Sequence, residues 1–284
     1  MIEDDEVEAL LESLKDEDLH VRIFTINSIV DNPGKKQTVS VLIKMLKEDV
    51  ALVRSRIAWA LGKIADERTI NPLILALNDE EPEVRKNATR SLGDMMVFDA
   101  IPSLVNKLED TSWAVRAESV VVLEHLGWVP SSDKEEVLSL IAKEKWEKLL
   151  EQENLDEQLL ECFIDDPDKD VRSKIAWILG EIRSNNSIKH LFNLLMNDNF
   201  QDVKEQAASA IGKIGGDEGL SLLKQALESE NWFIRKCATS ALGYSRDLLV
   251  VDILENLLED DNRFISESAK EALERIKSKH NIKS

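Results

Sequence analysis

A ten-residue phrase that recurs along this chain constrains its fold more than any other feature. The phrase has the form Val-Arg-x-x-Ala-x-x-Ala-Leu-Gly, with conservative changes. Its copies begin at Val21, Val53, Val84, Val115, Val171, Val203, Ile234 and Ile265. The steps between these positions are 32, 31, 31, 56, 32, 31 and 31 residues. A period this constant predicts a stack of similar units interrupted by one insertion of about 25 residues.

Each unit has the pattern of two helices. Counting the first residue of the phrase as zero, apolar side chains fall at positions 0, 4, 7, 8 and 11, which form one face of a helix. A second amphipathic segment, such as residues 70–77, completes each unit. A helix pair of this size cannot bury its apolar face alone, so the pairs must stack. We therefore predict one all-α solenoid over residues 1–284, with about eight helix pairs and an insertion at about residues 128–153.

These phrases, for example VRKNATRSLGDM from Val84 and VKEQAASAIGKIGG from Val203, resemble HEAT-like repeats of the short type first noted in bilin lyases. The resemblance covers roughly residues 1 to 280. It implies a right-handed superhelix in which the Val-Arg helices line the concave surface. It also implies a structural ladder of arginine and aspartate between neighbouring units, with the arginines Arg22, Arg54, Arg85, Arg116, Arg172 and Arg235. Lys204 and Ser266 depart from this pattern, which predicts a weaker rung and an open end.

The insertion contains Pro130 and a Ser-Ser-Asp cluster, followed by two short apolar faces. This pattern predicts two extra helices. We interpret them as a brace between the fourth and fifth units in preference to a hinge, because Trp128 and Trp146 supply large apolar surfaces to bury.

Charge and composition argue against several classes of partner. The formal net charge is −19, so the overall field repels both nucleic acid and anionic membrane surfaces. No segment has the length of apolar sequence that spans a membrane, and the acidic N-terminus lacks the pattern of a secretory signal. Cys162 and Cys237 fit neither a disulfide framework nor a CxxC metal site. We therefore expect a cytoplasmic protein.

The sequence contains no recognisable set of catalytic residues. Some helical-repeat proteins that this chain resembles are di-iron hydroxylases, recognised by repeated His-Glu pairs. The four histidines, His20, His125, His190 and His280, lie in different units, and none is followed by glutamate. Cys237 has no histidine nearby that could act as its base. We therefore predict no metal, no cofactor and no enzymatic activity.

A partner would contact the exposed ridge of the inner helices, which the helical wheel assigns to positions 2, 3, 6 and 10. The candidate residues on this ridge are Phe24, Arg56, Trp59, Lys63, Lys86, Asn87, Arg90, Lys174, Trp177, Lys236 and Tyr244. Tryptophan and arginine are frequent interface hot spots. Trp59 and Trp177 could equally fill gaps between neighbouring helices, and the sequence leaves both interpretations open.

The main hypothesis is a non-enzymatic scaffold, monomeric or weakly dimeric, that binds an acidic or amphipathic segment of a protein partner in its concave groove. One alternative is a bilin-lyase-like or chaperone-type subunit that acts on a tetrapyrrole protein. The other is a nucleic-acid binder similar to helical-repeat DNA glycosylases. The net charge disfavours it, as do the ridge acids Glu118, Glu181, Glu205, Glu267 and Glu271.

Overall fold

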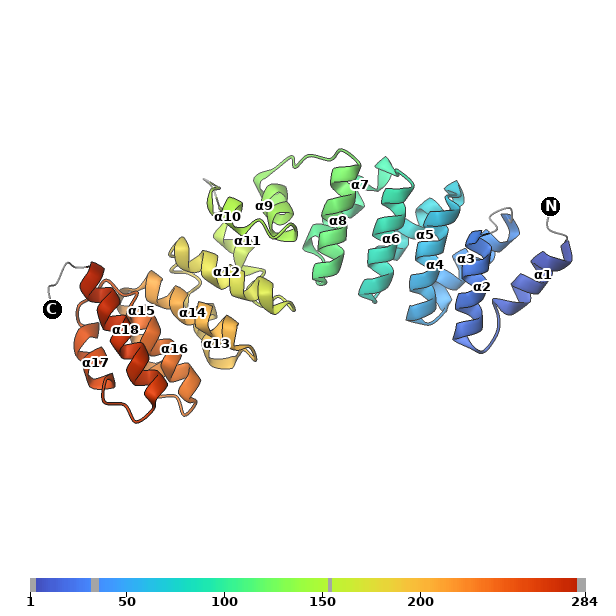
Figure 1. Ribbon diagram of the computed structural model, residues 1–284. Coiled ribbons are helices and arrows are strands. Elements are labelled where there is room, and N and C mark those ends of the chain that lie inside the picture. The colour runs from blue at the N-terminus through green and yellow to red at the C-terminus, as the bar shows by residue number, and fades with distance from the viewer. Residues whose placement is uncertain (1–3, 32–35, 153–154, 280–284) are drawn as a thin grey trace. The chain divides into compact units, whose positions relative to one another are not determined.

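The computed structural model describes residues 4–31, 36–152 and 155–279, and every regular element within these ranges is helical (Figure 1). The prediction of an all-α solenoid built from helix pairs is confirmed. Each start of the recurring phrase lies in a helix, as predicted, and this helix, called the inner one below, follows its partner in the chain instead of preceding it. Within the described ranges, no helix is both long and apolar enough to cross a membrane. The chain divides into two compact units, Met1–Glu144 and Lys145–Ser284.

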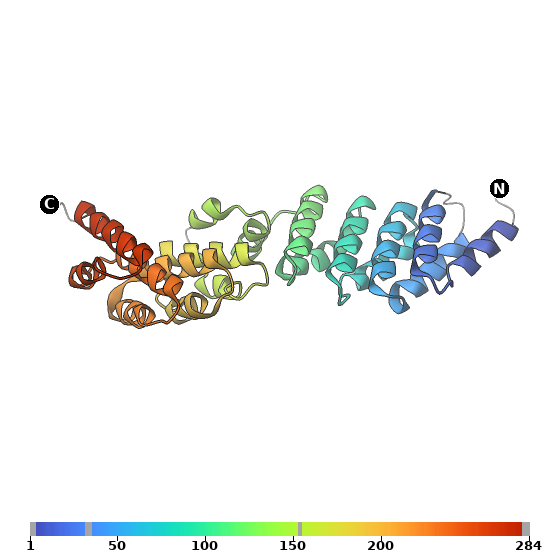
Figure 2. The same ribbon diagram turned by 60° about the horizontal axis from the view of Figure 1, so that its bottom comes forward.

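The first unit contains four helix pairs. Its inner helices, α2 (Leu19–Asp31), α4 (Ala51–Ile64), α6 (Pro82–Asp94) and α8 (Trp113–His125), lie side by side in both views (Figures 1 and 2). The outer helices are α1 (Asp4–Ser13), α3 (Lys36–Glu48), α5 (Ile70–Ala76) and α7 (Ile101–Asn106), with short 3₁₀ turns at Glu67–Thr69, Phe98–Ala100 and Lys107–Glu109. Its core is the apolar face that the periodicity predicts, including the fully buried Val53, Ile57 and Leu61 of α4.

The second unit contains the other four pairs. Its inner helices are α12 (Lys169–Glu181), α14 (Gln201–Ile214), α16 (Trp232–Leu242) and α18 (Arg263–Lys279). Each of them packs on the next. The outer helices are α11 (Glu157–Glu161), α13 (Ile188–Asn197), α15 (Gly216–Leu227) and α17 (Val250–Leu257).

The insertion forms two short helices, as predicted. Helix α9 (Asp133–Ala142) packs on α8, and α10 (Trp146–Leu150) packs on α12. The division between the compact units falls between these two helices, so each unit receives one of them. The brace, and the single solenoid over residues 1–284, therefore stay predictions.

The arginine ladder is present within both units. Arg85 on α6 donates from Nε and one Nη to the two carboxylate oxygens of Asp110, at 2.8 and 2.6 Å. Equivalent pairs join Arg22 to Asp49, Arg54 to Asp79 and Arg172 to Asp198. Lys204 departs from this pattern, as expected, and donates instead to the carbonyls of Leu195 and Met196. Arg235 also forms no rung and donates to the carbonyls of Ser229 and Glu230.

Neighbouring inner helices approach each other closely at the recurring glycine. A Cβ atom added to Gly180 of α12 would lie 2.7 Å from the Cα of Ala210 in α14. The same addition at Gly243 of α16 would lie 2.8 Å from the Cα of Ala272 in α18. Contacts this short exclude any side chain at these positions. Because the helices touch along this strip, side chains from adjacent inner helices converge on one surface.

Candidate functional site

In the first unit, the predicted ridge residues are largely engaged with one another. The Arg56 guanidinium lies 3.7 Å from the ring centroid of Trp59 and donates to the side chain of Asn27. Burial lowers the pKa of Arg56. Trp59 is half-buried beneath this cation, whereas Phe24 is 71% exposed.

The remaining ridge residues of the first unit also have partners. Lys63 pairs with Asp94 at 2.8 Å, Lys86 with Glu83 at 2.7 Å and Arg90 with Glu118 at 2.6 Å. Asn87 donates to the hydroxyl of Ser55 at 2.8 Å. Neighbouring acids therefore neutralise three of the ridge cations of this unit, Lys63, Lys86 and Arg90.

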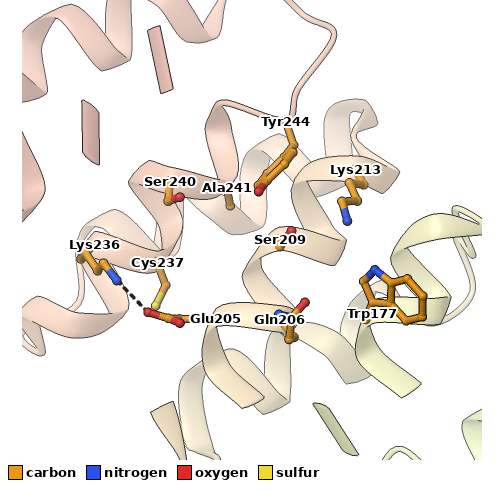
Figure 3. A pocket seen from close by; sticks show the side chains of 10 residues that line it. All are labelled: Trp177, Glu205, Gln206, Ser209, Lys213, Lys236, Cys237, Ser240, Ala241 and Tyr244. Carbon is orange, nitrogen blue, oxygen red and sulfur yellow. Dashed lines mark hydrogen bonds and ion pairs between the residues drawn. The ribbon is translucent and has the colours of Figure 1, made fainter. Parts of the chain in front are cut away.

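In the second unit, three predicted ridge residues, Trp177, Lys236 and Tyr244, line one pocket of about 420 Å³. Trp177 of α12 lies at one end, Lys236 of α16 lies at the other, and side chains of α14 lie between them (Figure 3). Lys174, also predicted, places its Nζ atom 5.5 Å from the ring centroid of Trp177. The complete lining is Trp177, Glu205, Gln206, Ser209, Lys213, Lys236, Cys237, Ser240, Ala241 and Tyr244. The pocket therefore combines two aromatic rings with polar side chains from two inner helices, α14 and α16.

The charges in this pocket are balanced. Lys236 pairs with Glu205 at 2.6 Å, and Lys213 pairs with Glu181 at 2.7 Å. Lys213 also lies 5.4 Å from the ring centroid of Tyr244. Because each ammonium group has a carboxylate partner, neither lysine supplies a free base to the pocket.

The pocket thiol is unsuited to nucleophilic chemistry. Cys237 is buried, and this burial, together with the charge of Glu205, raises the pKa of its thiol to about 12. The thiolate is the reactive form of cysteine, and it is scarce at neutral pH when the pKa is this high. The side chains that line the pocket are therefore suited to binding a ligand rather than to forming a bond with it.

Residues of the sixth unit that the sequence analysis did not assign to the site contribute much of this pocket. Glu205, Gln206, Ser209 and Lys213 occupy positions 2, 3, 6 and 10 of α14, which are the ridge positions that the helical wheel predicts. The signal was therefore present in the periodicity. Glu205 is among the ridge acids named above, whereas Gln206, Ser209 and Lys213 are not aromatic and do not stand out in an acidic chain.

Three cations, Lys213, Arg275 and Lys279, lie against the ring of Tyr244 at the edge of the pocket. The Arg275 guanidinium lies 4.3 Å from the ring centroid of Tyr244, and the Nζ atom of Lys279 lies 5.7 Å from it. Burial lowers the pKa of Lys279, and so does repulsion from Arg275, Arg246, Arg183 and Lys213, in that order. We call these five residues, Arg183, Lys213, Arg246, Arg275 and Lys279, the basic cluster.

The histidines do not form the metal site of a His-Glu hydroxylase. His20, His125 and His190 are exposed and belong to α2, α8 and α13, and His280 lies outside the described residues. The part of the chain that the structure describes contains no group of three or more His, Cys, Asp or Glu side chains placed to hold a metal ion. The residues present therefore do not fit a di-iron centre of that kind.

Comparison with protein families places the repeats in a known class. The model of HEAT repeats matches residues 7–80, 70–152, 157–224 and 188–274, and so covers most of the chain. The structure of human deoxyhypusine hydroxylase is similar in fold, with 18% sequence identity and a TM-score of 0.40 over 84% of this chain and 96% of that protein.

Two kinds of relative share sequence with this chain. Deoxyhypusine hydroxylase from Drosophila melanogaster is 23% identical over 257 residues, which cover 89% of this chain and 83% of the relative. Phycocyanobilin lyase subunit alpha from Picosynechococcus is 37% identical over 79 residues, which cover 25% of this chain and 30% of the relative. The relatives that match over most of the chain are enzymes. The prediction of a non-enzymatic scaffold is therefore wrong. That prediction depended on the lack of a catalytic motif in the sequence, and functional groups that are far apart in a sequence form no such motif.

Proposed function

Because this chain belongs to the HEAT-repeat family, we propose that it is the chromophore-binding subunit of a lyase-type enzyme, which holds a linear tetrapyrrole in the pocket of its second unit. The observation that carries the proposal is the pocket itself, which brings the rings of Trp177 and Tyr244 together with polar side chains from α14 and α16. A tetrapyrrole is a conjugated ring system with polar edges, and aromatic walls with a few polar groups suit such a ligand.

The size of the pocket supports this proposal. Its volume of about 420 Å³ lies within the range of small-molecule sites. The local identity of 37% to a phycocyanobilin lyase subunit supports the same class of ligand. Hydroxylation like that of the other relatives is not proposed, because the described residues do not provide the metal ligands.

The protein partner in this proposal is the protein that accepts the chromophore. An acceptor thiol can add across a carbon–carbon double bond of the tetrapyrrole: the sulfur–carbon bond forms, and the thiol proton passes to the adjacent carbon. This addition consumes no oxidant or reductant. Cys237 keeps its proton at neutral pH, so the attacking thiol would belong to the acceptor protein. The role of this chain is then to hold and orient the chromophore. Its free cysteines are compatible with a cytoplasmic location.

Titration of the purified protein with phycocyanobilin tests this function. We expect a saturable change in the visible absorbance of the chromophore and quenching of tryptophan fluorescence. Trp177→Ala should weaken binding about tenfold or more, as the loss of an aromatic contact does at a binding site. Trp59→Ala is the matched control, since Trp59 occupies the same helix position in the first unit and should leave binding unchanged.

A transfer assay tests the enzymatic part of the proposal. The protein, phycocyanobilin and an apo-phycobiliprotein are mixed, and covalent chromophore is detected by fluorescence after denaturing electrophoresis. We expect more adduct of defined attachment with the wild-type protein than with Trp177→Ala. No saturable binding of phycocyanobilin by the wild-type protein, or equal losses in the two tryptophan variants, would overturn the proposal.

A further inference from the structure

The basic cluster is unusual because most of its cations have no acidic partner. Among the described residues, no carboxylate lies within ion-pair distance of Arg183, Arg246, Arg275 or Lys279; Lys213 alone is paired. This is unexpected in a protein that carries 55 acidic and 36 basic side chains. Several other cations of the inner helices pair with a carboxylate of a neighbouring repeat, as Lys63 does with Asp94 and Arg90 does with Glu118.

The cluster is assembled by the repeat architecture. Lys213 lies in the last turn of α14, Arg246 follows the end of α16, and Arg275 and Lys279 lie on α18. Arg183 follows the end of α12. Because inner helices stack in parallel, their C-terminal ends meet along one edge of the second unit. The cluster thus combines residues from four successive repeats.

Capping of helix ends explains only part of this arrangement. Arg275 donates to the carbonyl of Ser240 at 3.2 Å, and Lys279 donates to the carbonyl of Tyr244 at 3.3 Å. Cations are favourable near the C-terminus of a helix because they interact with its dipole. Each of these bonds uses one donor and leaves the others of that side chain available. Burial lowers the pKa of Lys279, and repulsion from the other four cations of the cluster acts in the same direction.

Tyr244 lines the pocket and contacts the basic cluster. It lines the pocket with Trp177, and its ring contacts Lys213, Arg275 and Lys279 of the cluster. Since the lysines that line the pocket are already paired with glutamates, the pocket alone offers little for an anionic group. Among the described residues, two cations without a carboxylate partner, Arg275 and Lys279, lie against the ring of Tyr244 at the edge of the pocket.

We propose that the basic cluster around Tyr244 binds the carboxylate groups of the ligand whose conjugated rings occupy the adjoining pocket. This proposal rests on the proposed function and specifies its substrate as a dianionic tetrapyrrole rather than a neutral one. Guanidinium and ammonium groups bind carboxylates through charge-assisted hydrogen bonds, and Arg183, Arg246 and Lys279 are exposed to solvent.

The test compares phycocyanobilin with its dimethyl ester, which keeps the ring system and removes both negative charges. We expect the wild-type protein to bind the ester about tenfold more weakly than the free acid. The double variant Arg275→Gln, Lys279→Gln should bind the acid as weakly as the ester, and Arg275→Lys should retain most of the affinity. The control pair Lys63→Gln, Arg90→Gln removes two cations that have carboxylate partners in the first unit and should change nothing.

A second ligand keeps the test independent of the tetrapyrrole. Benzene-1,2,4,5-tetracarboxylate should bind the wild-type protein, more weakly as salt rises, and should fail to bind the double variant. Equal binding of bilin and ester overturns the carboxylate site and leaves the proposed function intact. If no bilin binds, the proposed function fails, and the tetracarboxylate then tests the basic cluster alone. Tetracarboxylate binding that the double variant loses would support an anion site at the cluster. No tetracarboxylate binding to the wild-type protein would overturn that site. Circular dichroism of each variant establishes that it is folded.

Discussion

The arginine ladder predicts that two ion pairs formed by residues of the same helix contribute very differently to the free energy of unfolding. Arg85 and Arg90 both lie on α6 and both hold a carboxylate of the next repeat through two bonds. The side chains of Arg85 and Asp110 are only 9% and 5% exposed, whereas that of Arg90 is 48% exposed. Asp110→Asn and Glu118→Gln each remove one negative charge and preserve the volume of the side chain.

The buried pair should cost more to break. Removing one partner of a buried pair costs about 3–5 kcal/mol when it leaves the other charge uncompensated. Arg85 would still donate to the carbonyls of Asp79 and Glu80, at 2.8 and 3.0 Å. Asparagine would keep an oxygen that can accept from Arg85 and from the N–H of Ser112. We therefore expect Asp110→Asn to lose about 2–3 kcal/mol of unfolding free energy, and Glu118→Gln to lose less than about 1 kcal/mol.

Urea unfolding followed by circular dichroism measures both losses, with the dependence on urea concentration compared between variants to verify that the same transition is observed. The double variant serves as a check on additivity, since both arginines belong to one helix. Equal losses for the two single variants, or a loss below about 0.5 kcal/mol for Asp110→Asn, would refute the argument that burial of the rung determines its contribution.

Three further predictions concern the second unit. Burial raises the pKa of Asp198, but hydrogen bonds from its ladder arginine and from a backbone N–H outweigh this effect and hold the pKa below its ordinary value. The ionised Asp198 therefore stabilises the folded protein above about pH 4, and this stabilisation is lost as the pH falls through the folded pKa. We expect Asp198→Asn to have a lower Tm at pH 7 than the wild type and a Tm that changes less on acidification. Gly180→Ala should destabilise the second unit by about 1–2 kcal/mol in urea unfolding, because overpacking against the backbone of Ala210 costs more than the gain of about 1 kcal/mol in helix propensity. A more stable variant would contradict the close approach of the two helices at this glycine. Iodoacetamide at pH 8 should alkylate the exposed Cys162 about a hundredfold faster than Cys237, measured by mass spectrometry, and equal rates would show that the Cys237 thiol is accessible and ionised.

The sequence by itself determined the repeated helix pairs and the buried face of each inner helix. Spacing of apolar residues is a local property, because a helix places positions 0, 4, 7, 8 and 11 on one side whatever surrounds it. Four of the six predicted ladder arginines, Arg22, Arg54, Arg85 and Arg172, form the expected rungs, because these rungs repeat with the period of the unit. Arg116 and Arg235 donate to backbone carbonyls. Even the ridge that lines the pocket, including Trp177 and Tyr244, follows from the helical wheel.

Only the tertiary structure decided which ridge residues act together. In the first unit, acids from neighbouring repeats neutralise Lys63 and Arg90, so the local positive charge visible in the sequence does not persist. In the second unit, Arg275 and Lys213 are 62 residues apart in the chain and yet contact the same ring of Tyr244. Such convergence depends on the distance and alignment between stacked helices, which the close approach at Gly180 and its equivalents sets. A one-dimensional pattern carries no information about that distance, so the pocket and its basic edge appear only when the helices are packed.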